Sequence, residues 1–120
     1  MVYTGYFSQI DNYLRFNSSL QLVSISLYTQ NWIKQNYCIE LYDKLMPEKD
    51  VLLQYKSTEH ISDFIENFGK QLSRLNVDEV YGELDNKIIL CYERPEDFCH
   101  RQLVKLWFIS NGYECKEIKL

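Results

Sequence analysis

A short segment around residue 90 carries reactive side chains of several chemical types. The apolar run Ile88–Cys91 leads through Glu93 to Cys99, His100 and Arg101, where a helix is expected to begin. A carboxylate, a thiol, an imidazole and a guanidinium therefore follow one buried strand closely in sequence. Such groups can bind an anion and transfer protons, so we place the candidate site here.

The start of the helix after this strand is the expected anion-binding element. We take Asp97 as its N-cap, which puts Cys99, His100 and Arg101 in the first turn. The positive end of a helix attracts anions and lowers the pKa of a cysteine, and a guanidinium fits phosphate or carboxylate. Successive helical side chains point about 100° apart, so His100, Arg101 or both should face a crevice. Cys99 either lines that crevice or packs in the core.

Glu93 is the candidate acid, base or nucleophile, with His100 assisting it. It follows an apolar strand, where loss of hydration weakens the acidity of a carboxyl group. The alternative for Glu93 is an ion pair with Arg101, Arg94 or Lys56. The sequence favours neither the catalytic role nor the ion pair.

Aromatic and hydroxyl side chains complete the candidate ligand-binding set. Aromatic residues make up 15% of the chain, including ten Tyr, and tyrosines suit both planar ligands and half-buried packing. The ligand-binding candidates are Arg101, Cys99, Tyr92, Tyr3, Tyr55, Lys56, Ser24 and Ser26.

The cysteines do not show the spacing of a familiar metal site. Seven residues separate Cys91 from Cys99, and Cys99 and His100 are adjacent ligands that would diverge on one helix. The chain also lacks the cysteine density of a secreted disulfide scaffold. We predict no metal, no cofactor and no disulfide bond. No Gly-rich phosphate loop or Gly-x-Ser-x-Gly nucleophile elbow occurs either.

Composition is that of one ordinary globular domain spanning residues 1–120, with 46% hydrophobic and 25% charged residues. Polar Tyr3 and Thr4 interrupt the N-terminus where a signal peptide needs an apolar core, which predicts a cytoplasmic protein with no membrane association. The net charge of −4 argues against binding a long nucleic acid, although a small phosphate-bearing ligand is compatible with it. The net charge does not exclude a local basic patch, for which the candidates are Lys34, Lys44, Lys49 and Lys56.

Strands and helices are expected to alternate along the chain. The expected strands are Val2–Phe7, Leu20–Leu27, Ile88–Tyr92 and Tyr113–Ile118. Helical segments are expected around Ile10–Leu14, at Glu48–Tyr55, at Glu59–Leu75 after an N-cap at Thr58, at Val77–Leu84 and at Asp97–Asn111, with Gly112 as C-cap. The region Tyr28–Met46 reads as a loop with short helical turns that covers a pocket.

This order predicts an α/β fold with a mostly parallel sheet of about four strands and helices on both faces. The strand that starts at Ile88 should lie inside the sheet, because it is apolar on both sides. We expect Glu93, His100 and Arg101 to converge on one crevice at the carboxyl end of the sheet. Cys91 and Cys99 should be mainly buried.

Several motifs resemble those of the domain-of-unknown-function family 488. They are Leu90-Cys91-Tyr92-Glu93, Phe98-Cys99-His100-Arg101, Asn111-Gly112-Tyr113, Tyr3-Thr4-Gly5-Tyr6-Phe7, Val23-Ser24-Ile25-Ser26-Leu27, Leu45-Met46-Pro47 and Leu53-Gln54-Tyr55-Lys56. The resemblance covers nearly the whole chain and is weakest over Ile33–Glu40. It implies a small Rossmann-like domain of prokaryotes and their phages, with the Cys-Tyr-Glu and Cys-His-Arg residues at its site.

The leading hypothesis is binding of a small phosphate-bearing molecule, such as a nucleotide or nucleoside derivative. Hydrolysis or transfer at a glycosidic or phosphate bond is compatible with a carboxylate next to an anion site, and whether the chain is an enzyme stays open. One alternative is a non-catalytic phage or defence-associated binder that sequesters a nucleotide signal or a partner protein. Nucleic-acid processing is a second alternative.

Overall fold

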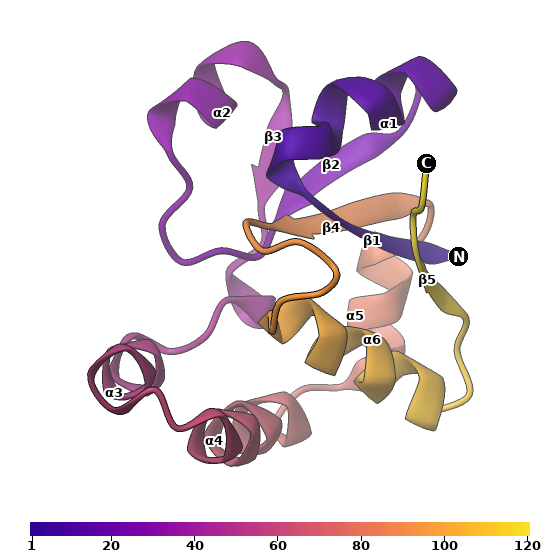
Figure 1. The fold of residues 1–120 in the computed structure, drawn as a ribbon. Helices are drawn as coiled ribbons and strands as arrows, with labels where there is room; N and C mark the ends of the chain where they lie inside the picture. Colours follow the sequence, from indigo (N-terminus) through magenta and orange to yellow (C-terminus); the bar gives the residue numbers. More distant parts are fainter.

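A five-stranded parallel sheet forms the centre of the molecule (Figure 1). The computed structural model describes all residues from Met1 to Leu120. The strands are β1 (Val2–Tyr6), β2 (Gln21–Ser24), β3 (Ile39–Leu41), β4 (Lys87–Cys91) and β5 (Cys115–Glu117), in the spatial order β3-β2-β4-β1-β5. The predicted α/β class and Rossmann-like arrangement are confirmed, with every strand pair parallel and one strand more than the sequence indicated.

The strand β4 occupies the interior position that its double-sided apolarity predicts. It pairs with β1 on one side and with β2 on the other, and its residues from Ile88 to Cys91 have no exposed surface. Ile88 and Leu90 pack against one face of the sheet, whereas Ile89 packs against the opposite face. Both faces of this strand are therefore covered, as parallel sheets require.

Helices cover both faces of the sheet. On one face lie the short 3-10 helix η1 (Phe7–Gln9), α1 (Ile10–Phe16) and α2 (Asn31–Asn36). After the second 3-10 helix, η2 (Asp43–Leu45), the other face carries α3 (Lys49–Thr58), α4 (Ile61–Ser73), α5 (Val77–Leu84) and α6 (His100–Ser110). Figure 1 shows α3 as the outermost of these, packed beside α4. None of the helices has both the length and the apolar composition needed to cross a membrane.

Gly5 on β1 allows α1 to approach the sheet closely. A Cβ atom at this position would lie only 2.6 Å from the Tyr13 hydroxyl oxygen, which is closer than packed atoms approach. That hydroxyl in turn accepts a hydrogen bond from the Tyr6 backbone N–H at 3.2 Å. Tyr13 therefore fixes the carboxyl end of β1 from the α1 side.

The edge strand β3 lies within the region that the sequence predicts as a loop. Its three residues include Glu40, and all three are at least partly exposed. A short edge strand with a charged residue at its centre has no continuous apolar run, so periodicity does not reveal it.

Two predicted N-caps are wrong. Thr58 ends α3 and donates its hydroxyl to the Gln54 carbonyl, and α4 begins after His60. Cys99, rather than Asp97, is the N-cap of α6. The C-cap of α6 is Asn111 rather than the predicted Gly112, but Gly112 follows it with a φ of +86°, in the left-handed region that glycine favours.

Candidate functional site

The chain connections that leave β2 and β4 run over opposite faces of the sheet. The helix α2 follows β2 on one face, where Ile33 packs, and α6 follows β4 on the other, where Val104 packs. Because β2 and β4 are neighbours, the chain diverges at their carboxyl ends and leaves a crevice between the connections. This is the position at which open α/β sheets bind ligands.

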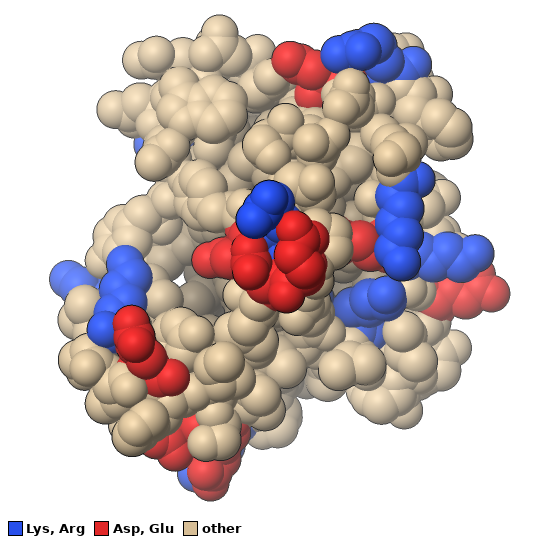
Figure 2. Space-filling view, in the orientation of Figure 1, with Lys and Arg blue, Asp and Glu red and all other residues tan.

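A pocket of about 190 Å³ lies in this crevice, and we call it the switch pocket. It is lined by the loop after β2, the loop after β4, the N-terminus of α6 and one side of α3. Figure 2 shows the surface hollowed between α3 and the β4–α6 loop. The lining residues are Ser26, Leu27, Tyr28, Pro47, Leu52, Lys56, Tyr92, Glu93 and His100.

The loop after β4 gives one rim of the switch pocket a negative charge. In Figure 2 acidic side chains gather there around a basic one, and Arg94 pairs with Glu96 and Asp97 in this loop. The opposite rim carries Lys56, whose ammonium lies 5.7 Å from the centre of the Tyr28 ring. Lys56 from α3 and Glu93 from the loop after β4 therefore both line the pocket.

Tyr92 ties the two loops of the pocket together. Its hydroxyl donates to the Tyr28 carbonyl at 2.9 Å and accepts from the Gln30 N–H at 2.8 Å. Its ring packs against Phe7, with the ring centres 4.6 Å apart. Tyr92 thus lies in the pocket wall as a positioning group for the loop that carries Tyr28.

His100 forms the floor of the pocket in a fixed orientation. Its Nε2 atom lies 2.7 Å from the Ile25 carbonyl oxygen, to which it donates. Its ring makes an edge-to-face contact with Phe68 at 5.4 Å between centres. Burial lowers the pKa of His100 to about 4, and the neighbouring Arg101 charge acts in the same direction. The hydrogen bond to Ile25 acts in the opposite direction but is the weaker effect. The imidazole is therefore neutral at pH 7, with Nδ1 free of a proton.

Arg101 does not face the crevice, so the position predicted for it is wrong. Its side chain has no exposed surface and makes a two-pronged ion pair with Glu117, from Nε at 3.0 Å and Nη2 at 2.9 Å. Nη1 donates to the Glu93 carbonyl oxygen at 2.6 Å and to Cys91 Sγ at 3.0 Å. Because α6 begins at His100, its second residue turns inward, toward a carboxylate that lies on β5.

Glu117 was not among the candidate residues, yet it completes the Arg101 network. Its carboxylate also accepts a hydrogen bond from the Thr4 hydroxyl. Burial alone would raise the pKa of Glu117, but the bonds from Arg101 and Thr4 outweigh burial and hold the pKa below its usual value. The sequence signal was weak, because a lone Glu near the C-terminus has no spacing relation to Arg101.

We expect the lowered pKa of Glu117 to make the free energy of unfolding depend on pH in the acidic range. The unfolded chain binds this proton below a pH of about 4.3, whereas the native carboxylate resists protonation until lower pH. The Glu117 contribution is therefore complete above that pH and is lost as the pH falls through the native pKa. Between pH 5 and pH 3, the free energy of unfolding measured with urea should fall less in Glu117→Gln than in the wild type. Glu114→Gln, which removes an exposed carboxylate of the same terminal segment, should keep the wild-type decline.

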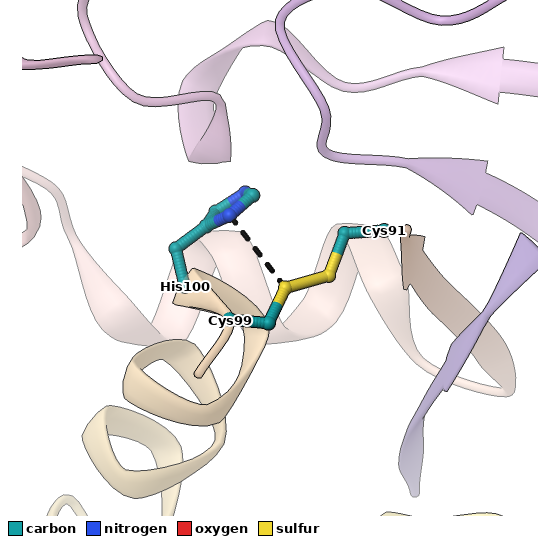
Figure 3. A group of neighbouring side chains, drawn as sticks. All are labelled: Cys91, Cys99 and His100. Atoms are coloured by element: carbon teal, nitrogen blue, oxygen red, sulfur yellow. Dashed lines mark hydrogen bonds between the residues drawn. A yellow bond between two sulfur atoms is a disulfide. The ribbon is translucent and has the colours of Figure 1, made fainter. Parts of the chain in front are cut away.

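Cys91 and Cys99 are buried, as predicted, but they form a disulfide bond (Figure 3), so the prediction of no disulfide is wrong. Cys91 ends β4 and Cys99 caps α6, so the fold brings both sulfur atoms to one point despite their spacing in sequence. His100 Nδ1 lies 3.8 Å from Cys99 Sγ. One donor atom from each of these three residues lies within 4.8 Å of the others, so the group can hold a metal ion when the thiols are free.

The remaining candidates divide between the pocket and the core. Ser26 and Lys56 line the switch pocket. Ser24 is buried and bonds Thr29, Tyr55 packs on Phe64 and Phe98, and Tyr3 packs on the α1 face of the sheet. Tyr28 lines the pocket without having been singled out, and its only signal was an aromatic residue just after a strand. The proposed basic patch is weakened because Lys44 pairs with Glu79 and Glu83.

Comparison with known proteins gave no relative from which to infer function. No family model matches the chain, and neither the curated proteins nor the solved structures gave a match. The resemblance to family 488 stays a prediction, and function is inferred from the pocket itself.

Proposed function

We propose that the chain binds a small phosphate-bearing molecule, such as a nucleotide or nucleoside derivative, in the switch pocket. The observation that carries this proposal is the position of the pocket, where the connections after β2 and β4 diverge. At this position Lys56 and the N-terminus of α6 provide positive potential, while Tyr28 and Tyr92 provide aromatic surface.

The anion is held by Lys56 and the first turn of α6 rather than by Arg101. The first N–H groups of a helix have no acceptor within the helix, and the α6 N-cap Cys99 makes no side-chain capping bond. His100, the first residue of α6, lines the pocket. The guanidinium of Arg101 is fully used by Glu117, Cys91 and the Glu93 carbonyl.

The size of the pocket limits which part of the ligand it encloses. Its volume of about 190 Å³ is below the roughly 300–1,000 Å³ of typical ligand pockets, so it encloses a phosphoryl or ribosyl group rather than a whole nucleotide. A second, shallower hollow of about 550 Å³ shares the Ser26–Tyr28 loop and extends to Lys34. The rest of the ligand lies across this loop, against the exposed ring of Tyr28.

Glu93 is the group that decides between an enzyme and a binder. Glu93 lines the pocket, and a carboxylate at this position can act as acid, base or nucleophile at a glycosidic or phosphate bond. His100 has a more limited role, because Ile25 already accepts its Nε2 proton. The acidic β4–α6 loop beside the pocket disfavours binding of a long polyanion. Nucleic-acid processing is therefore less well supported than either an enzyme or a non-catalytic binder of a small ligand.

Binding is tested by titrating the protein with adenosine 5′-monophosphate, ribose 5-phosphate and inorganic phosphate in a calorimeter. For the phosphate compounds that bind, Lys56→Ala should lower the affinity about 10–100-fold, because a charge-assisted hydrogen bond contributes roughly 1.5–3 kcal/mol. Lys70→Ala is the matched control, since Lys70 is exposed on α4 and pairs only with Glu66. No binding by any of the three compounds, or equal losses in both variants, would contradict the proposal.

Turnover is tested with the same compounds by following their phosphorus resonances over time. Glu93→Gln keeps the size of the side chain and removes the carboxylate, so the variant should bind like the wild type. If the chain is an enzyme, product formation should disappear in this variant. If the wild type returns each ligand unchanged, the chain is a non-catalytic binder.

A further inference from the structure

We infer that the reduced chain binds one Zn²⁺ ion through Cys91 Sγ, Cys99 Sγ and His100 Nδ1, directly beneath the switch pocket. This metal site is independent of the ligand proposed for the pocket. It rests on the placement of three donor atoms, on the orientation of the imidazole and on the surroundings of the two sulfur atoms (Figure 3).

The separations of the donor atoms suit a tetrahedral ion. Zn–S and Zn–N bonds of about 2.3 and 2.0 Å place a sulfur and a nitrogen ligand about 3.5 Å apart. Cys99 Sγ and His100 Nδ1 are 3.8 Å apart, although they belong to adjacent residues. Cys99 is the N-cap of α6 and has extended backbone angles, so its side chain does not diverge from that of His100 as it would inside a helix.

The imidazole of His100 has the orientation of a metal ligand. Its Nε2 proton is donated to the Ile25 carbonyl oxygen at 2.7 Å, and this leaves the Nδ1 lone pair directed toward the sulfur atoms. Metal-binding histidines usually donate their second ring N–H to a carbonyl or carboxylate, which fixes the tautomer and the ring. The edge-to-face contact with Phe68 restrains the same ring from the α4 side.

The two cysteines have surroundings that suit thiolates. Nη1 of Arg101 lies 3.0 Å from Cys91 Sγ, and a buried guanidinium favours a negatively charged sulfur. The Cα atoms of Cys91 and Cys99 are 7.3 Å apart, beyond the roughly 4.4–6.8 Å that disulfides usually span. Two thiolates on one Zn²⁺ ion need their sulfur atoms about 3.8 Å apart, and this backbone spacing leaves room for that separation.

Metal binding requires the disulfide to be reduced first. A dithiol or phosphine reductant supplies two electrons, the S–S bond breaks, and two protons from solvent complete the two thiols. The reductant leaves as its own disulfide, or as a phosphine oxide whose oxygen comes from water. Zn²⁺ then displaces both thiol protons to solvent, so the site is neutral before the fourth ligand is counted.

The ligand set favours zinc with one position left for water. Two thiolates and an imidazole are soft and borderline donors, which favour Zn²⁺ over the hard Mg²⁺ and Ca²⁺ ions. Three protein ligands leave the fourth tetrahedral position open. Because His100 lines the switch pocket, the pocket provides the route by which the ion and its water reach the buried sulfur atoms.

The inference is tested with Zn²⁺ and Co²⁺ on the full chain, reduced by a phosphine and then freed of metal. We expect one equivalent of Zn²⁺ per chain in competition with a chromophoric chelator. Co²⁺ should give the thiolate-to-metal charge-transfer band and the intense visible bands of a tetrahedral ion. The oxidised chain, with Cys91 and Cys99 joined, should bind neither ion at this site.

Substitutions identify the ligands. Cys99→Ser and His100→Gln should each lower the Zn²⁺ affinity more than about 100-fold, because even the outer-shell partners of a metal contribute 10–100-fold. Cys38→Ser, which removes an exposed free thiol, should bind Zn²⁺ like the wild type. Circular dichroism checks that each variant is folded, and the Co²⁺ spectrum of the wild type decides the matter if Cys99→Ser does not fold. The inference is overturned if the reduced wild type binds no Zn²⁺, if its Co²⁺ spectrum lacks thiolate bands, or if Cys38→Ser loses the ion as Cys99→Ser does.

Discussion

Replacing Arg101 by Ala should lower the free energy of unfolding by about 3–5 kcal/mol, because it leaves a buried carboxylate without its partner. Arg101 is wholly buried, and the side chain of Glu117 is only 11% exposed. The substitution also removes the donors to Cys91 Sγ and to the Glu93 carbonyl oxygen. Urea unfolding at pH 7 measures this loss of unfolding free energy directly. The dependence of the free energy on urea concentration should be compared between the variants.

Two further variants separate the ion pair from other effects of this substitution. Arg94→Ala removes an exposed arginine that pairs only within its own loop, and its cost should stay within about 0.5 kcal/mol. In Arg101→Met/Glu117→Gln both charges are gone and Thr4 keeps an acceptor. Part of the stability should therefore return relative to Arg101→Ala. Equal stability of Arg101→Ala and Arg94→Ala would show that the buried pair does not form.

The outcome for Arg101 shows what spacing along the chain does not determine. The sequence places Arg101 in the first turn of a helix next to a crevice, and that location is right to within the position of the cap. The direction of the side chain depends on whether the helix starts at residue 98 or at residue 100. It also depends on Glu117, which becomes a neighbour only when β5 joins the sheet beside β1.

The main elements were predictable because their periodicity reports burial. The helix α5 has the predicted bounds, Val77–Leu84, and β4 is the buried run around Ile88. The strand β3 and the disulfide were not predictable, each for its own physical reason. A three-residue edge strand buries little apolar surface, and the meeting of Cys91 with Cys99 depends on a loop whose path leaves no pattern in the sequence.

The position of Glu93 follows from the network around Arg101 rather than from Glu93 itself. Arg101 holds the Glu93 carbonyl oxygen at 2.6 Å, and Tyr92, the residue before it, bonds the loop after β2. The backbone carbonyl of Glu93 is thereby tied to the buried Arg101, and the residue before it is tied to the loop after β2. A buried ion pair thus serves the pocket without touching it, because it fixes the residue from which the reactive side chain extends.

Replacing Phe68 by Ala should also cost about 3–5 kcal/mol of unfolding free energy, since it empties a fully buried site on the face of the sheet that α3 to α6 cover. Phe68 stacks on Phe64 at 5.7 Å and holds the His100 ring at its edge. The cavity left behind lies next to that imidazole. We therefore expect weaker Zn²⁺ binding by the reduced variant as well as lower stability, both measured as for the substitutions above.

The matched control for this substitution is Phe16→Ala, which removes the same atoms from a side chain that is 75% exposed. It should change stability by no more than about 0.5 kcal/mol and should leave the His100 ring undisturbed. Phe68→Leu retains most of the apolar volume and should cost less than Phe68→Ala, because the remaining cavity is smaller. If Phe68→Ala were as stable as Phe16→Ala, the α4 helix would not pack against the start of α6. The floor of the switch pocket would then lack the support that fixes His100 between Ile25 and the two sulfur atoms.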